Sequence, residues 1–313
     1  MAHFERGAIM RAPSAEVRAG GKGIDAARVG KSLKRRSPLL VLVGDLDRDE
    51  YCRFLVNEGI NFKTSKYKGN IRVATTYHET NSPVTTIVNE EGPSIVQSEW
   101  DNYLAELRRE IKPSEIVASM GSFPRGVTEE NVAELIDLVH ENKSLIFFDT
   151  TPHFLTWAIK HHADFVSPNL DEAEAVIKGN AEDLFLGESS NARARARSAA
   201  LALCGMGAKV AIVHAGAEGS ALAYAGKTVF VPQVQIVVSS TVGAGDSLAA
   251  GFILKTEEQG SLSDLDSIDW KLSLQFGSAT AAAACEMGRS GDLDPIRVQQ
   301  LFTSLINLGG LEI

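Results

Sequence analysis

The sequence of 313 residues is poor in cysteine and has no long apolar segment. Cys52, Cys204 and Cys285 lie far apart and form no CxxC pair, which excludes motifs built on such a pair, and buried free thiols are expected. No apolar run reaches the length of about 18 residues that a membrane span needs. Residues 1–20 lack the apolar core of a signal peptide. We therefore expect a cytoplasmic protein with no membrane partner.

Positive charge is scarce as well. The 31 Lys and Arg residues face 40 Asp and Glu residues, which gives a formal net charge of −9. Because binding of a nucleic-acid backbone needs a basic face, nucleic acid is excluded as the main partner. An anionic substrate is still possible, since a local basic pocket can lie within an acidic protein.

Short apolar runs typical of buried strands alternate with amphipathic helical segments. The segments 100–111 and 132–139 place their apolar residues at helical spacing. This alternation predicts an α/β fold: a three-layer, Rossmann-like arrangement in which a mostly parallel sheet lies between helix layers. The expected strands are Leu39–Gly44, Glu115–Ser119, Leu145–Asp149, Asp164–Ser167 and Lys209–His214.

One region interrupts this alternation. Asn70–Asn89 is rich in Thr and Val, and a turn is expected at Asn81–Pro83, which together predict a β-hairpin. The hairpin could be a small lid over a site or an edge hairpin without a function. We expect one α/β core made of residues 20–65 and 93–313, with a β lid made of residues 1–19 and 66–92.

The segment Thr241–Asp246 places small residues and an acid before an expected helix at Ser247–Lys255. Glycine lets the backbone N–H groups approach an anion, and the helix N-terminus carries a partial positive charge. A phosphate, or the charge that develops during phosphoryl transfer, suits such a place. Asp246 would repel a phosphate, so it is either the base that accepts a proton from an attacking hydroxyl or a cap of the helix.

Two further segments are candidates for ligand binding. Gly20–Asp25 places glycines and Lys22 before a helical segment, but it is neither a Walker A loop nor a dinucleotide fingerprint, and an ordinary turn explains it as well. Ser167–Glu172 lies between a strand and a helix. There, Asn169 and Glu172 could reach a metal ion and phosphate oxygens through water, or simply begin the helix.

Together these motifs resemble those of one family, the ribokinase/phosphofructokinase B sugar kinases. The stretches 241–246, 168–172 and 214–219 are similar to its [DN]TxGAGD, NxxE and SxGxxG motifs. Three others are similar to the GGKGxNxARV, GSLPPG and NEPGP segments of the branch that contains 1-phosphofructokinase and tagatose-6-phosphate kinase. These are GGKGIDAARV at 20–29, GSFPRG at 121–126 and NEEGP at 89–93.

The resemblance implies a ribokinase-like fold and a role for each motif residue. Asp246 would be the general base, with Gly243, Ala244 and Gly245 forming the anion hole for the transferred phosphoryl group. Phosphoryl transfer depends mainly on such positioning and charge stabilisation. ATP and Mg²⁺ are the implied cofactors, and Glu172 is the implied metal-binding residue. The residues implied to hold the nucleotide are Asn169, His214, Gly216, Glu218, Gly219 and Gly245.

The acceptor implied by the resemblance is a ketohexose phosphate, with fructose 1-phosphate ahead of tagatose 6-phosphate. Arg72 would reach the sugar phosphate, because its guanidinium matches phosphate oxygens. The lid edges would allow a homodimer. The other implied acceptor residues are Gly21, Lys22, Gly23 and Asp25.

Departures from the family pattern concentrate on the acceptor side. Relatives open with a strand that carries an NPxxD sequence, whereas this sequence opens with a segment that resembles the one after that strand. Asp25 and Ala74 stand where the family has Asn. Asp25 would repel a phosphate or take over binding of sugar hydroxyls. A catalytically weak protein that binds sugar phosphates therefore stays an alternative. A kinase of another small carbohydrate is disfavoured by the GGKG segment, Arg72 and NEEGP.

Overall fold

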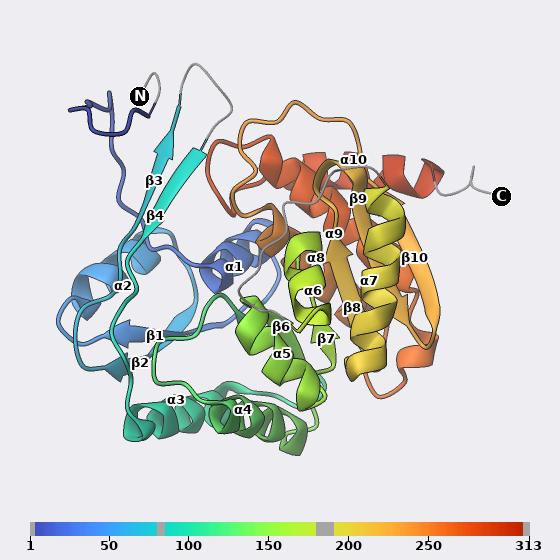
Figure 1. Ribbon diagram of the computed structural model, residues 1–313, viewed down its shortest axis with the longest axis horizontal. Coiled ribbons are helices and arrows are strands. Elements are labelled where there is room, and N and C mark those ends of the chain that lie inside the picture. Colours follow the sequence, from blue (N-terminus) through green and yellow to red (C-terminus); the bar gives the residue numbers. More distant parts are fainter. Residues whose placement is uncertain (1–3, 80–84, 180–190, 309–313) are drawn as a thin grey trace.

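The computed structural model describes residues 4–79, 85–179 and 191–308, and its main sheet has six strands in the order β10-β9-β8-β7-β6-β5 (Figure 1). Strands β5 to β8 are parallel, and β9 and β10 continue the sheet in antiparallel pairing. The predicted mostly parallel sheet is confirmed, although the sequence analysis did not identify β9 and β10. The strands are β5 (Ile116–Met120), β6 (Leu145–Asp149), β7 (Phe165–Val166), β8 (Val210–His214), β9 (Gly219–Tyr224) and β10 (Lys227–Pro232).

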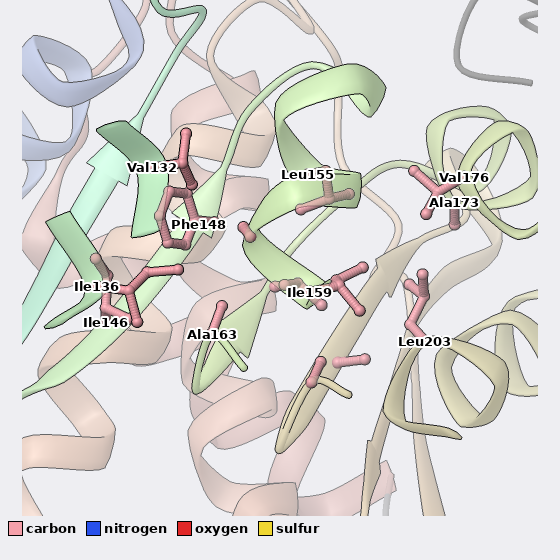
Figure 2. Close-up of a cluster of buried hydrophobic side chains, with 14 of the residues drawn as sticks. Val132, Ile136, Ile146, Phe148, Leu155, Ile159, Ala163, Ala173, Val176 and Leu203 are labelled. Atoms are coloured by element: carbon pink, nitrogen blue, oxygen red, sulfur yellow. The ribbon is translucent and has the colours of Figure 1, made fainter. Parts of the chain in front are cut away.

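One layer of helices packs on the face of the sheet that receives Ile146 and Phe148 of β6. Strand side chains alternate between the two faces, so these residues point away from Phe147. Figure 2 shows Ile146 and Phe148 among side chains of this layer, with Leu155 and Leu203 in the same cluster. The helices that contribute to it are α3 (Gln97–Glu110), α4 (Glu129–Glu141), α5 (Pro152–Lys160), α6 (Leu170–Ile177) and α7 (Ala192–Met206).

The opposite face of the sheet is covered by a second helix layer. Phe147 and Phe165 point to this side and pack against Phe252, with ring centroids 6.3 and 6.1 Å from it. Trp270 stacks on Phe252 at 6.2 Å. Buried aromatic and apolar area of this kind is the main stabilising contribution to such a core. The helices are α1 (Lys22–Ser32), α8 (Ala244–Glu258), α9 (Trp270–Cys285) and α10 (Pro295–Leu308).

A separate two-stranded sheet lies beside this core. The expected strand Leu39–Gly44 is β1, and it pairs in parallel with β2 (Phe62–Tyr67) across α2 (Arg48–Asn57). Among the described residues this pair is a sheet of its own. Helix α1 contacts both β1 and β5, and thus connects the two sheets.

The predicted hairpin is present as β3 (Ala74–His78) and β4 (Thr85–Asn89), which pair antiparallel and project from the body of the protein (Figure 1). The expected turn at Asn81–Pro83 lies outside the described residues. Residues 4–21 contain no strand, and Phe4 packs on Tyr77 of β3 with ring centroids 5.2 Å apart. The division into a core and a lid stays a prediction.

The three cysteines are free, as expected, but only Cys285 is buried. Cys52 and Cys204 are half-buried, and Cys204 packs at the edge of the apolar cluster that contains Ile146 and Phe148. Burial raises the pKa of the Cys204 thiol to about 11, so this thiol is largely protonated near neutral pH.

Candidate active site

Helix α8 begins at Ala244, three residues before the expected start at Ser247. Its N-cap is Gly243, whose φ of +80° lies in the left-handed region that favours glycine. A Cβ at this position would lie 2.8 Å from Cβ of Ser290, so the close packing also requires glycine. Asp246 therefore lies in the first turn of the helix and is not its cap.

The Asp246 side chain is directed toward other acids and one lysine. The residue is only 7% exposed, and Nζ of Lys22 lies 4.0 Å from its Oδ1. Burial raises the pKa of Asp246 to about 8, and the negative charge of Asp149 adds to this rise while Lys22 opposes it. A carboxyl group with a pKa near neutral is suited to accept and release a proton.

Lys22 is the first residue of α1, so the helix begins inside the GGKG motif and not after it as the sequence suggested. Its N-cap is Gly21, with φ +134°, and Gly23 packs within the first turn near Leu39. Nζ of Lys22 forms an ion pair of 2.6 Å with Oδ1 of Asp149. The ammonium group thus lies between Asp149 and Asp246.

Asp149 was not among the predicted site residues. It is the last residue of β6 and is 2% exposed. In open parallel sheets, ligands bind at the carboxyl ends of the strands. The acid that ends the apolar run Leu145–Asp149 was therefore a signal that could have identified it.

Asp25 is also buried and belongs to the same cluster. Its Oδ1 accepts hydrogen bonds from Arg28 (2.6 Å) and from Oγ of Ser290 (3.0 Å). The Asp25 carboxyl contributes to the raised pKa of Asp246, and its Oδ2 lies 3.4 Å from the position that a Cβ on Gly243, the N-cap of α8, would take. Asp25 is therefore directed toward the candidate base, on the inner side of α1.

Asn169 and Glu172 form a reciprocal cap at the start of α6. Oδ1 of Asn169 accepts from the N–H of Glu172 (2.8 Å), and Oε2 of Glu172 accepts from the N–H of Asn169 (3.0 Å). Burial raises the pKa of Glu172, Lys22 opposes the rise, and Asp149 adds to it. In the described ranges, no group of three or more His, Cys, Asp or Glu side chains is placed to hold a metal ion.

The expected nucleotide loop follows β8. Nε2 of His214 lies 2.8 Å from Oγ of Ser167, and burial lowers the pKa of this histidine, so it is neutral at physiological pH. Residues Gly216–Glu218 form an exposed turn of 3₁₀ helix. Gly219 has φ +124°, and a Cβ there would meet the backbone of Val231 and Pro232. A parallel bridge between Asn169 and His214 places this loop next to the start of α6.

Arg72 is exposed and precedes β3 at the base of the hairpin. A Cβ on Gly92 would lie 3.4 Å from Cβ of Arg72, so the two segments are in contact. Arg125, from the GSFPRG segment, donates to the carbonyl oxygen of Gly92 (2.9 Å). The two arginines thus approach the same backbone, whereas a contact of Arg72 with a sugar phosphate stays a prediction.

Comparison with known proteins identifies the family. The model of the pfkB family carbohydrate kinases matches residues 2–296. The chain belongs to this family. A 1-phosphofructokinase from Borreliella burgdorferi is 30% identical over 298 residues, which cover 91% of this chain and 89% of the relative. A 1-phosphofructokinase from Haemophilus influenzae is 28% identical over 282 residues, covering 88% and 84%.

Solved structures show the same fold. Phosphofructokinase-2 from Escherichia coli, solved with substrates and products, superimposes with a TM-score of 0.80 at 23% identity and covers 97% of this chain and 93% of that one. A ribokinase from Thermotoga maritima gives a TM-score of 0.67 at 18% identity, covering 96% and 93%. The predicted ribokinase-like α/β fold is therefore confirmed.

Membership of the pfkB family makes this protein a phosphotransferase that acts on a sugar hydroxyl, with ATP implied as the phosphoryl donor. Within the part of the chain that the structure describes, no helix is long and apolar enough to cross a membrane. A cytoplasmic location stays a prediction. The E. coli neighbour also has a tetrameric inhibited form, which is a property of that protein.

Proposed function

We propose that this pfkB kinase phosphorylates a ketohexose phosphate, with fructose 1-phosphate preferred over tagatose 6-phosphate and Asp246 as general base. The observation that carries the proposal is the buried carboxyl of Asp246 in the first turn of α8, beside Lys22. The name 1-phosphofructokinase, which relatives along most of the chain bear, supports the choice of acceptor.

In the proposed reaction, Asp246 takes the proton of the acceptor hydroxyl while the hydroxyl oxygen forms a bond to the γ-phosphorus of ATP. The bond from that phosphorus to the β,γ-bridging oxygen breaks, and ADP leaves with the electron pair. Backbone N–H groups of Gly243, Ala244 and Gly245 form the anion hole at the helix N-terminus, where partial positive charge offsets the developing negative charge. Lys22 adds a full positive charge nearby.

The nucleotide would lie between the start of α6 and the loop after β8, which are adjacent. Asn169, His214 and the turn Gly216–Gly219, including Glu218, would contact it. Glu172 fits Mg²⁺, because its hard carboxylate oxygens are the ligands that this ion prefers beside substrate phosphates. When bound, Mg²⁺ would neutralise phosphate charge.

The acceptor would lie against the start of α1, at Gly21, Lys22, Gly23 and Asp25, with its phosphate toward Arg72. Positive φ at Gly21 turns the backbone tightly there, and Gly23 leaves the helix surface without a side chain. Arg72 and Arg125 both contact the backbone around Gly92, at the base of the hairpin. A planar guanidinium group suits a phosphate dianion at that position.

The test is release of ADP from MgATP with each of four acceptors: fructose 1-phosphate, tagatose 6-phosphate, fructose 6-phosphate and unphosphorylated fructose. Wild type is measured beside Asp246→Asn, a near-isosteric change that removes the base. We expect turnover with fructose 1-phosphate above the others, lost in the variant. Turnover that survives in Asp246→Asn would overturn the role of this residue.

A second candidate is a protein that binds sugar phosphates with little turnover. The buried acids Asp25 and Asp149 favour it, because both surround Lys22 and Asp246 with negative charge that repels a phosphorylated acceptor. It predicts measurable binding of MgATP and of a sugar phosphate by calorimetry, with no release of ADP from any of the four mixtures.

We also propose a homodimer formed through the hairpin. The side chains of Val73, Ile87 and Val88 are 58%, 48% and 54% exposed, so apolar side chains are exposed at the hairpin, whose strand edges are open. Light scattering after gel filtration should give twice the chain mass. Ile87→Glu should give the monomer, and a monomeric wild type would refute the proposal.

A further inference from the structure

Two short segments join the β3–β4 hairpin to the body of the protein: residues 68–73 before β3 and residues 90–95 after β4. Arg72, the residue proposed to meet the acceptor phosphate, lies in the first segment and packs against the second. A Cβ on Gly92 would lie 3.4 Å from Cβ of Arg72 and 3.5 Å from its Cδ. The place of the Arg72 side chain therefore depends on how both segments are held.

The first segment is attached to the body of the protein just before Arg72. A Cβ on Gly44, the last residue of β1, would overlap the carbonyl oxygen of Gly69, so the segment passes directly against the end of that strand. The N–H of Gly69 donates to Oδ1 of Asp45 at 2.8 Å, and its carbonyl oxygen accepts from the N–H of Leu46 at 3.2 Å. The backbone is thus fixed three residues before Arg72.

Asp47 continues this attachment up to the residue next to Arg72. It is the N-cap of α2, yet its side chain makes no cap hydrogen bond. Its two carboxylate oxygens instead accept from the N–H of Ile71, at 2.9 and 3.0 Å, and Nδ2 of Asn70 lies 3.4 Å from Oδ2. An aspartate at an N-cap ordinarily stabilises its own helix. Here the charge-assisted hydrogen bonds hold the base of the hairpin.

Arg125 holds the second segment. Its Nη2 donates to the carbonyl oxygen of Gly92 at 2.9 Å, and its Nη1 lies 3.0 Å from Oε2 of Glu91. The backbone carbonyl oxygen of Arg125 accepts from the N–H of Ile95 at 2.8 Å. An exposed ion pair stabilises little by itself, so the two contacts with backbone groups are the ones that fix this segment.

We propose that Asp47 and Arg125 are positioning residues that hold Arg72 ready for the acceptor phosphate, and that they thereby set the preference of the enzyme for a phosphorylated sugar. The inference rests on the proposed contact between Arg72 and that phosphate. Ordering a long side chain on binding costs conformational entropy. A side chain whose surroundings are fixed beforehand loses less of it, and the ligand binds more tightly. Asp47 and Arg125 provide this pre-organisation on the two sides of Arg72.

The experiment measures KM for fructose 1-phosphate at saturating MgATP, together with its Kd by calorimetry. Arg72→Ala should raise both about 10- to 100-fold, because a hydrogen-bonded charge is lost. Asp47→Ala and Arg125→Ala should each raise both about three- to tenfold, the usual effect of one hydrogen bond, and leave kcat within about twofold of wild type. Asp47→Asn should stay near wild type, because its amide oxygen still accepts the N–H of Ile71.

Double variants show whether the two residues act through Arg72. In an Arg72→Ala background, Asp47→Ala and Arg125→Ala should raise KM and Kd no further, because the side chain that they position is gone. Equal rises with and without Arg72 would overturn the inference, since the two residues would then support the site by another route. Unchanged KM and Kd in both Asp47→Ala and Arg125→Ala would also overturn it.

The matched controls remove the same residue types from other ion pairs. Asp49 is on α2 as well and pairs with Arg48 at 3.1 Å. Arg108 pairs with Glu141 at 3.0 Å, and its side chain is 58% exposed, the same fraction as that of Arg125. Asp49→Ala and Arg108→Ala should leave KM and Kd unchanged. Rises as large as those of the positioning variants would show that any loss of surface charge suffices, which contradicts the inference.

The outcomes separate the inference from the proposed function. Without ADP release from any acceptor, the kinase proposal fails, and the Kd values still test the two positioning residues. If Arg72→Ala raises KM but the two positioning variants do not, only the inference fails. If fructose 1-phosphate is turned over and Arg72→Ala has no effect, the kinase proposal stands, whereas the contact of Arg72 with the phosphate and the inference built on it are both refuted.

Discussion

The starts of α6 and α8 each carry an acidic residue at the same helical position, but the two carboxylates make different contacts. Glu172 and Asp246 are each the third residue of their helix, after the N-caps Asn169 and Gly243. Glu172 accepts from the N–H of its own N-cap and closes a capping box. Asp246 instead faces Lys22 and Asp25 on α1. Glu172 thus stabilises its own helix with one carboxylate oxygen, whereas the Asp246 carboxyl makes no such cap and faces another helix.

The N-cap residue explains this difference. Asn169 has an extended backbone and a side chain that accepts from the first turn, which is the geometry of a reciprocal cap. Gly243 has no side chain and a left-handed backbone, so the corresponding box does not form. Glycine at the N-cap thus gives up helix stabilisation, and the acid that would complete the box can serve a site between two helices.

The largest expected effect is on catalysis, and it distinguishes Asp246 from Glu172. Asp246→Asn should lower kcat for ADP release about 10²- to 10⁴-fold, the usual contribution of a general base. Glu172→Gln should act mainly on KM for MgATP, because Gln still accepts the N–H of Asn169 and only the charge is lost. Steady-state kinetics measures both variants at saturating acceptor. A similar fall in kcat for both would contradict the different roles of Asp246 and Glu172.

The next effect is on stability as a function of pH. The pKa of Asp246 is raised to about 8 in the folded protein, whereas an unfolded Asp titrates near its ordinary value. Between these values the folded state binds the extra proton, so stability should fall as pH rises from 5 toward 8. Each pKa unit corresponds to about 1.4 kcal/mol. Urea unfolding should show a smaller fall in Asp246→Asn, and parallel curves for the two proteins would contradict the raised pKa.

Much of the fold follows from the sequence because its signals are local. The runs Leu39–Gly44 and Leu145–Asp149 are strands with the predicted bounds, since continuous apolar runs of this length are buried strands in α/β proteins. Strands β9 and β10 were missed because their pairing depends on an antiparallel turn at the sheet edge. The separation of β1 and β2 from the main sheet is a tertiary property that no periodicity reports.

In the candidate site, too, local features follow from the sequence, whereas contacts between distant residues do not. The GAGD segment predicts a helix start suited to bind an anion, because small residues and an acid before an apolar helix are visible in sequence, and α8 does start there. The contacts of Asp149 with Lys22 and of Asp25 with Ser290 join residues that are far apart in the chain. Sequence alone therefore names Asp246, but the charges that set its pKa come from packing between α1, β6 and α8.

Two glycines of the same helix start provide the third prediction. Gly243→Ala should destabilise the protein by about 1–3 kcal/mol, because alanine is strained at φ +80° and its Cβ would meet Ser290. Gly245→Ala is the control: its Cβ meets nothing within 4 Å, and alanine should stabilise the helix by up to about 1 kcal/mol. Urea unfolding measures both variants. Equal stabilities would mean that the left-handed N-cap imposes no constraint.

The smallest expected effect tests the start of α6. Asn169→Ala removes the acceptor for the N–H of Glu172 and should cost about 1 kcal/mol of stability. Asn169→Asp keeps an N-cap acceptor, so its stability should stay near that of wild type. The added charge would repel a bound nucleotide, and KM for MgATP should rise in this variant. If Asn169→Asp leaves KM unchanged, the start of α6 serves only its own helix, and the nucleotide site must be sought nearer the loop after β8.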